Sequence, residues 1–286
     1  EYDGANIMTV LKRHFKISTN LIKDLKKYKE GIQVNGEHRR VVDFVAKGDI
    51  LKITIRDTAS ENIVPTDIPL DIVYEDEDVL VINKPPNMPT HPSMGNYENS
   101  LANGVMYYYK SKGEERVFRA VNRLDKDTSG LMAVAKNSYI HARLGEEIQK
   151  KELKRKYMCI VCGDVERDGT VDAPIRRADG SVINRIVAPD GQRAVTHYRV
   201  IKRYREYTLL EMELETGRTH QIRVHMAYIG HPLVGDWLYG TENHNIAKRQ
   251  MLHSCYLCFT HPITGQIMEF KDEMAEDMRA FIEKLS

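Results

Sequence analysis

The chain has 286 residues, of which 42% are hydrophobic and 29% charged. This composition is typical of a folded globular protein and excludes an intrinsically disordered one, and the length allows one large domain and one small domain. The sequence contains no run of about 18 or more apolar residues, which is the length a membrane-spanning helix needs. No charged-then-apolar leader opens the sequence, so we expect a cytoplasmic protein without a membrane partner.

The charge is unevenly distributed along the chain, although the net charge is only +1. Residues 1–56 carry twelve Lys or Arg and seven Asp or Glu, a local charge of +5. Residues 61–80 carry seven acidic residues and no Lys or Arg. Such an asymmetry is typical of a nucleic-acid surface, although a solvated helix face would show the same charges.

The N-terminal region predicts two helices followed by short strands. Apolar residues recur at helical spacing from residue 6, and Ser18-Thr19-Asn20 offers an N-cap for the second helix. Asn35-Gly36 predicts a hairpin turn, and residues 50–55 alternate as a strand does.

This arrangement resembles the ribosomal-protein-S4-like RNA-binding domain. Val34-Asn35-Gly36 and Gly48-Asp49 carry the resemblance, which covers roughly residues 5–57. It implies a small α/β domain over residues 1–57 that contacts RNA. The expected RNA-binding cations on the second helix are Lys23, Lys26 and Lys27. A small subdomain without an RNA function is the alternative.

Residues 58–70 contain Pro65 and Pro69 and are typical of a linker. Residues 71–286 then predict one α+β domain with a mixed, mostly antiparallel sheet flanked by helices, because strands dominate without a βαβ rhythm. The expected strands are 72–74, 79–83, 131–135, 157–161, 194–200, 207–214 and 256–259. The expected helices are 100–109, 138–150, 220–228 and 273–284.

The chain has two CxxC pairs, Cys159 with Cys162 and Cys255 with Cys258, whose spacing matches that of zinc-binding or redox motifs. Both lie in apolar stretches that predict buried strands. Residues three apart on a strand point to opposite faces, so neither pair would converge on one metal. We therefore expect free, reduced cysteines, which is consistent with the cytoplasm.

The stretch Asn122–Gly130 is a polar loop ahead of an apolar strand. Asp, Thr, Ser and Gly favour turns, so we expect a capped turn over Asp127–Gly130. The turn does not account for Asp125, which follows Arg123 and precedes the turn residues. An aspartic protease is not expected, because it needs two apposed carboxylates and the chain has one imperfect Asp-Thr-Ser-Gly.

A second polar stretch runs from Gly217 to His225. Thr219 is expected to cap a helix whose first turn presents Gln221 and Arg223, and an Arg there would pair with a carboxylate. An ordinary exposed helix is the alternative. A metal site formed with His231 and Asp236 is not expected, because His220 and His225 are five residues apart and do not share a helix face.

Seven ordered motifs resemble the RluA-type family of RNA pseudouridine synthases over roughly residues 70–270. They are Asp71–Pro85 followed by His91-Pro92, Arg123-Leu-Asp125 with Thr128-Ser-Gly130, Lys156-Tyr157, Gly191–Tyr198, Gly217–His225, His231–Gly240, and Arg249–His253 with His261-Pro262. One departure concerns Asn122, where the family usually has His. Asn can hydrogen-bond in a turn but cannot titrate, so acid–base work at this position is in doubt.

The resemblance implies an isomerase that needs no cofactor and no metal. In it Asp125 would be the nucleophile or its close equivalent, Arg223 would pair with it, and Tyr157 would pack on the target base. Arg123 would occupy the place that the flipped base leaves. The remaining residues expected to contact substrate RNA are Asn122, Thr128, Arg218, His220 and Gln221.

The expected partner is a structured RNA whose target base lies in a single-stranded loop, because extruding a base costs least there. The basic N-terminal region favours ribosomal RNA over transfer RNA, and we expect a monomer. Two alternatives remain at this point: an inert RNA-binding ribosome-assembly factor with a relic site, and a hydrolase that releases free base.

Overall fold

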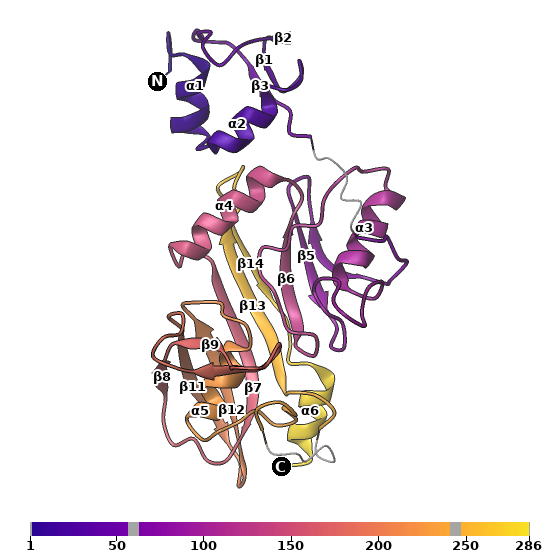
Figure 1. Cartoon of the computed structure of the whole chain (residues 1–286), viewed down its shortest axis with the longest axis vertical. Helices are drawn as coiled ribbons and strands as arrows, with labels where there is room; N and C mark the ends of the chain where they lie inside the picture. The colour runs from indigo at the N-terminus through magenta and orange to yellow at the C-terminus, as the bar shows by residue number, and fades with distance from the viewer. Residues whose placement is uncertain (1, 57–62, 241–246, 286) are drawn as a thin grey trace.

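The computed structural model describes residues 2–56, 63–240 and 247–285. The residues before 57 form a small unit around their own hydrophobic cluster. The rest of the described chain is built on one large sheet with helices on both faces (Figure 1). This architecture confirms the predicted α+β class. No helix in the described ranges is both long and apolar enough to cross a membrane.

The N-terminal unit contains α1 (Ile7–Thr9), the π-helical turn η1 (Val10–His14), α2 (Thr19–Leu25), and the strands β1 (Ile32–Val34), β2 (Glu37–His38) and β3 (Leu51–Ile53). Ser18 caps α2 as expected, since its side chain accepts a hydrogen bond from the Leu21 amide at 3.1 Å. Asn35 and Gly36 both have positive φ, +52° and +85°, as a two-residue hairpin turn requires. Tyr139 of the larger unit packs against this cluster.

The large sheet has the strand order β4-β5-β6-β13-β7-β12-β11-β8, with β14 paired to β13. All its pairings are antiparallel except that of β6 with β13. Its strands are β4 (Asp71–Glu75), β5 (Val79–Lys84), β6 (Ser129–Ala135), β7 (Lys154–Cys162), β8 (Gly169–Asp172), β11 (Val195–Arg203), β12 (Tyr207–Leu214), β13 (Leu252–Thr260) and β14 (Ile267–Lys271).

Helices cover both faces of the sheet, which explains why β5 and β6 are buried along nearly their whole length instead of alternating between buried and exposed residues. On one face α3 (Leu101–Ser111) and α5 (Gln221–Tyr228) pack in the largest hydrophobic cluster. On the other face α4 (Ser138–Gln149) packs against β5 and β6. The C-terminal helix α6 (Glu276–Glu283) packs near β7 and β12.

Four observed strands were absent from the sequence prediction: β8, β14, and the two-stranded hairpin of β9 (Ile175–Arg177) and β10 (Arg185–Val187). They are short and rich in charged residues, so their apolar periodicity is weak. Residues 58–62 of the predicted linker, and residue 57 before it, lie outside the described ranges, and residues 63–70 form no helix or strand. All four cysteines are free and lie on β7 and β13, as the strand interpretation predicted.

Candidate active site

Asp125 opens a β-turn that ends at Thr128, whose amide donates to the Asp125 carbonyl at 3.1 Å. The predicted turn over Asp127–Gly130 is therefore wrong by two residues, because Ser129 and Gly130 already belong to β6. Gly130 is needed for strand contact: its φ is +110°, and a Cβ there would lie 2.2 Å from the Ser254 carbonyl oxygen of β13. The turn thus ends where β6 meets β13, and we call residues Asp125–Thr128 the catalytic turn.

The catalytic turn borders a cavity of about 790 Å³. Its walls come from the segment before the turn, from β7, and from the segment that leads into α5. The Asp125 side chain is 24% exposed, so its carboxylate is sheltered but accessible from the cavity.

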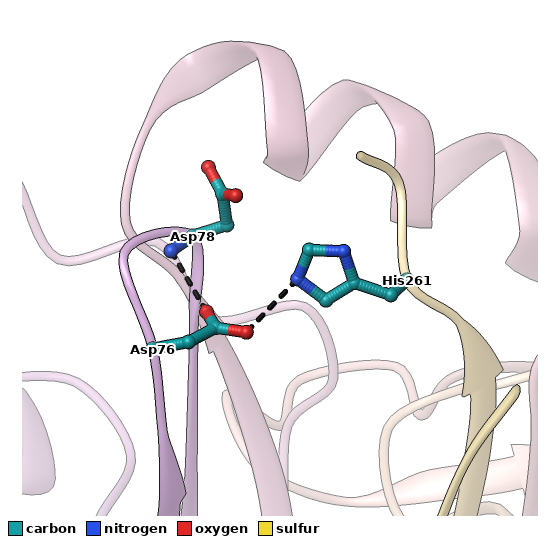
Figure 2. A group of neighbouring side chains, drawn as sticks. All are labelled: Asp76, Asp78 and His261. Carbon is teal, nitrogen blue, oxygen red and sulfur yellow. Dashed lines mark hydrogen bonds and ion pairs between the residues drawn. The ribbon is translucent and has the colours of Figure 1, made fainter. Parts of the chain in front are cut away.

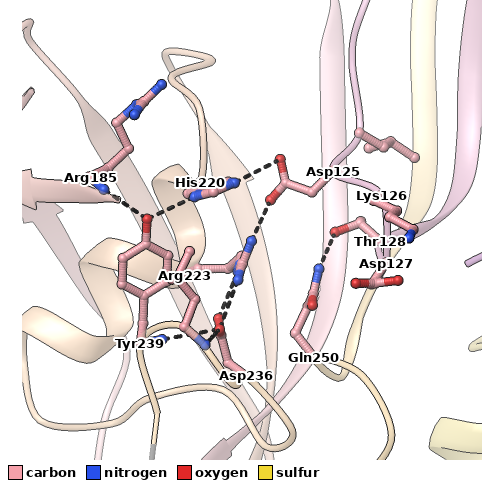
Figure 3. A network of polar contacts seen from close by, with 12 residues as sticks. Asp125, Lys126, Asp127, Thr128, Arg185, His220, Arg223, Asp236, Tyr239 and Gln250 are labelled. Atoms are coloured by element: carbon pink, nitrogen blue, oxygen red, sulfur yellow. Dashed lines mark hydrogen bonds and ion pairs between the residues drawn. The ribbon is translucent and has the colours of Figure 1, made fainter. Parts of the chain in front are cut away.

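Arg223 of α5 joins this carboxylate to a second one. Its Nη1 lies 3.3 Å from Asp125 Oδ2, while its Nε and Nη2 donate to the two Asp236 oxygens at 2.7 and 2.8 Å (Figure 3). Burial lowers the pKa of Arg223, but hydrogen bonds and charge from Asp236, with a smaller contribution from Asp125, raise it on balance. Asp236 therefore fixes the guanidinium in a charged state, and one nitrogen remains for Asp125.

His220 approaches the same carboxylate from the start of α5. It has a left-handed backbone with φ of +59° and makes no side-chain cap, so the prediction that Thr219 caps the helix is wrong. The Tyr239 hydroxyl accepts from the Arg185 amide at 2.9 Å and lies 2.7 Å from His220 Nδ1 (Figure 3). A hydroxyl oxygen can accept two hydrogen bonds, so the Tyr239 hydroxyl either donates to Nδ1 or accepts from it, according to the tautomer of the His220 ring.

The Nε2 atom of His220 lies 3.9 Å from Asp125 Oδ1, which is too far for a direct hydrogen bond. Burial lowers the pKa of His220, although the charge of Asp125 opposes this shift. At neutral pH the ring is therefore neutral, and its Nε2 atom faces the carboxylate across a small gap.

Tyr157 lies on β7 and forms part of the cavity wall. Its side chain is buried, and burial raises the pKa of its hydroxyl, while the charge of Asp125 acts in the same direction. The phenol therefore keeps its proton at neutral pH. This favours a contact surface or a proton donor over a free base.

Two buried cations hold the catalytic turn by its backbone. Lys84 donates to the carbonyls of Pro85, Met88 and Lys126 at 2.8, 2.8 and 3.1 Å. Arg249 donates to the Asp127 carbonyl at 3.0 Å and forms a bidentate ion pair with Asp277 of α6 at 2.7 Å. Burial lowers the pKa of Lys84 to about 7, although the charges of Asp127 and Asp125 raise it.

Three predicted RNA-contacting residues make hydrogen bonds within the protein. The Asn122 Oδ1 accepts from the Ala133 amide at 3.0 Å, which ties the loop to β6. Thr128 is buried and lies 3.4 Å from the Gln250 amide nitrogen. Gln221 makes four bonds to its surroundings, at 2.7 to 3.0 Å, so its amide has no capacity left for RNA. We assign Gln221 a structural role.

The predicted cations fall into two groups. Arg123 is exposed at the cavity edge, and Arg218 borders the same cavity while donating to the Arg193 carbonyl at 3.0 Å. Lys23, Lys26 and Lys27 are exposed on the N-terminal unit and do not border the cavity. The structure therefore does not bring these three lysines to Asp125.

Neither histidine cluster has the geometry of a metal centre. His225 bonds to Thr196 and to the Ala173 carbonyl, away from His220. Asp76, Asp78 and His261 do lie together (Figure 2). However, the His261 Nδ1 accepts from two backbone amides at 3.1 and 3.2 Å, so its proton is on Nε2 and points at Asp76, 3.0 Å away. A protonated nitrogen cannot ligate a metal.

Comparison with known proteins identifies the family to which this chain belongs. Residues 78–228 match the RNA pseudouridylate synthase family. The chain belongs to this family, in its RluA-type branch. It is 44% identical to the uncharacterized RNA pseudouridine synthase YjbO of Bacillus subtilis, over 93% of this chain and 94% of the relative. It is 40% identical to ribosomal large subunit pseudouridine synthase D of Pasteurella multocida, over 89% of this chain and 83% of the relative.

Solved structures agree at the level of the fold. Human RNA pseudouridylate synthase domain containing 4 superposes with a TM-score of 0.61 at 22% identity, over 75% of this chain and 92% of that one. The chain is thus an RNA pseudouridine synthase, an isomerase, on a pseudouridine-synthase fold.

Sequence reasoning gave no role to Asp236, Tyr239, Lys84 or Arg249, although all four lie in motifs that carry the family resemblance. Their neighbours in the sequence give no common signal of burial, since Lys84 follows Asn83 and Arg249 lies between Lys248 and Gln250. Their partners come from distant parts of the chain, so local sequence does not name them.

Proposed function

We propose that this enzyme converts uridine to pseudouridine at specific positions of large-subunit ribosomal RNA, with Asp125 as the nucleophile. The observation that carries the proposal is the position of the Asp125 carboxylate, which borders the cavity and is paired with the buried Arg223. Relatives named as ribosomal large subunit synthases support the choice of RNA.

The reaction needs a carboxylate beside the sugar of an extruded uridine. The C1′–N1 bond breaks, the uracil turns, and C5 bonds to C1′, after which C5 loses its proton and N1 gains one. Asp125 would attack C1′ or C6, or stabilise positive charge that develops on the ribose; each route uses the same anionic oxygen at the same place. Arg223, held by Asp236, orients that oxygen.

The cavity residues would support the turning base. Tyr157 offers an aromatic face and a protonated hydroxyl on the wall, and the neutral His220 faces Asp125 with its Nε2 atom. The exposed Arg123 stands at the edge, where it would fill the space that the extruded base leaves in the RNA. The family resemblance implies these roles, and the positions of the side chains at the cavity support them.

The N-terminal unit would grip the RNA through phosphates. Of its exposed lysines, Lys23 lies on α2, whereas Lys26 is the C-cap of α2 and Lys27 follows it, so the prediction that all three lie on the helix is corrected. Phosphate contacts from these lysines would add affinity that falls with salt. We propose residues 1–57 as this RNA-binding domain and residues 71–286 as the catalytic domain.

The test compares wild-type enzyme with Asp125→Asn on a large-subunit ribosomal RNA transcript, in a buffer containing EDTA. Pseudouridine is mapped by chemical labelling and primer extension. We expect activity from the wild type and a loss of at least about 10³-fold in the variant, since a nucleophile is removed. Asp164→Asn is the matched control, because Asp164 is half-exposed and paired with Arg203 away from the catalytic turn.

Three outcomes would redirect the proposal. Full activity in Asp125→Asn would remove Asp125 from the chemistry. Release of free uracil would indicate a hydrolase. Modification of transfer RNA, but not of the ribosomal transcript, would keep the enzyme and change its substrate.

A further inference from the structure

Arg155 lies on β7 two residues before Tyr157, so both side chains project from the same face of the strand. Arg155 borders the cavity that holds Asp125, and it also borders an adjoining hollow of about 170 Å³. Only 7% of the residue is exposed. It is thus a buried arginine on the wall of the active-site cavity.

This arginine has no partner within the described parts of the chain. No hydrogen bond or ion pair joins its guanidinium to another described residue, and its Nε is a buried donor left unpaired. The other buried arginines at this site, Arg223 and Arg249, each hold a carboxylate through two nitrogens. A buried charge without a partner is costly, so the site is arranged for an anion from outside.

Besides Asp125, the two carboxylates that border these hollows, Glu213 and Glu215, are already paired with cations, and Glu213 lies 3.6 Å from Lys154. Glu215, the acidic residue shared by both hollows, already binds Lys151 at 2.5 Å, His197 at 2.9 Å and Arg193 at 3.3 Å. These contacts lower the pKa of Glu215 to about 2, the hydrogen bond from Lys151 contributing most. Cations therefore outnumber carboxylates on this side of the cavity.

Gly217 allows the guanidinium to approach the loop before α5. A Cβ at Gly217 would lie 3.3 Å from Arg155 Nη1, so a larger side chain would press on the guanidinium. The next residue, Arg218, is exposed and borders the same cavity. The loop therefore offers a second cation beside Arg155 without covering it.

We propose that Arg155 binds a phosphodiester of the substrate RNA next to the target uridine and so positions that nucleotide over Asp125. The phosphodiester is the anionic group of RNA, and a guanidinium fork matches its oxygens in pairs. The inference rests on the proposed function but concerns binding, so it is tested by affinity and not by turnover.

The experiment measures binding of a labelled twelve-nucleotide oligouridylate to Asp125→Asn protein at several salt concentrations. We expect the further change Arg155→Met to weaken binding about tenfold, as loss of one charge-assisted contact would. We also expect the slope of log affinity against log salt to shrink by about 0.7, the amount for one phosphate of a single strand. Arg155→Lys should keep most of the slope and lose part of the affinity.

Arg279→Met is the matched control, because Arg279 is an exposed arginine of α6 paired with Glu273 and does not border either hollow. It should change neither affinity nor slope. Thermal unfolding of every variant separates misfolding from a lost contact.

An unchanged affinity and slope in Arg155→Met would overturn the proposal, as would an affinity loss with the slope intact, which would indicate a contact with the base. Failure of Asp125→Asn to bind the oligomer at any salt would also overturn it. Failure of the proposed function looks different: the wild type would bind RNA and form no pseudouridine.

Discussion

Two carboxylates of this protein, Asp125 and Asp76, each lie beside a histidine, and their surroundings differ. Asp76 accepts from the Asp78 amide and from His261 at 2.8 and 3.0 Å (Figure 2). It also accepts from the Val79 amide and the Tyr74 hydroxyl, each at 2.7 Å. The Asp125 carboxylate lies 3.3 Å from Arg223 Nη1 and 3.9 Å from His220 Nε2, and it borders a cavity. The saturated carboxylate holds loops together, whereas the incompletely satisfied one can act on a substrate.

The partner residues explain the difference. The amides that hold Asp76 belong to the turn between β4 and β5 and to the first residue of β5, and His261 directly follows β13. At Asp125, in contrast, the shorter bonds are made by the residues around it and not by the carboxylate itself. Arg223 binds Asp236, and Lys84 and Arg249 donate to carbonyls of the turn. Rigid supports thus hold the turn while its carboxylate stays accessible, as preorganisation for catalysis requires.

After replacement of Asp125 itself, Asp236→Asn should give the largest effect, because it breaks the support of Asp125. Breaking a buried ion pair leaves the Arg223 charge uncompensated, which costs about 3–5 kcal/mol of unfolding free energy. Arg223 would also turn toward Asp125 and occupy it, so kcat should fall at least about 100-fold. Urea unfolding and single-turnover assays measure the two effects.

The control for this change is Asp277→Asn, which removes a half-exposed partner of Arg249 and should destabilise less. Normal stability and normal kcat in Asp236→Asn would show that the Arg223–Asp236 pair does not support the site.

Lys84 gives a pH-dependent effect of intermediate size. Its folded pKa of about 7 lies below the ordinary value of 10.5, so the unfolded chain binds more protons between these values. The unfolding free energy should therefore rise with pH from about 7 upward, by up to about 1.4 kcal/mol per pH unit, and this contribution should be flat below pH 7.

Lys84→Met isolates this contribution, because it removes the titrating group and keeps the length of the side chain. Urea unfolding of both proteins is measured between pH 6 and pH 9, an experimental range of about three units chosen around the Lys84 pKa. The measurement gives the difference between their unfolding free energies at each pH. A constant difference across the range would mean that Lys84 does not titrate there.

Asp76→Asn should give the smallest effect and sharpen the contrast with Asp125. It weakens the bond to His261 and leaves the fold intact, so we expect a loss of about 1 kcal/mol in unfolding free energy and an unchanged kcat. Hydrogen bonds from Tyr74 and from the turn amides outweigh the effect of burial and lower the pKa of Asp76. Its stabilising contribution is therefore present near neutral pH and is lost as the pH falls through the lowered value.

Matched assays of Asp76→Asn and Asp125→Asn test the contrast directly. If Asp76→Asn abolished turnover without unfolding, the Asp76 group would belong to the functional machinery.

The sequence alone determined the fold class, most of the strands and the identity of the candidate nucleophile, because these depend on local patterning and ordered motifs. It placed Asp125 outside the turn and Thr219 at a helix cap, and both placements were wrong. Turn limits and caps depend on backbone contacts, here the pairing of Ser129 and Gly130 with β13, that no local pattern contains.

The tertiary structure alone decided which polar residues meet. Arg223 reaches Asp125 across 98 positions of the chain, and Arg249 reaches the Asp127 carbonyl across 122. It also showed that the Gln221 side chain has all its hydrogen-bond partners whereas the Arg155 side chain has not, although both residues are buried. Hydrogen-bond satisfaction is a property of the packed neighbourhood, since every buried donor must find its acceptor among residues brought together by the fold.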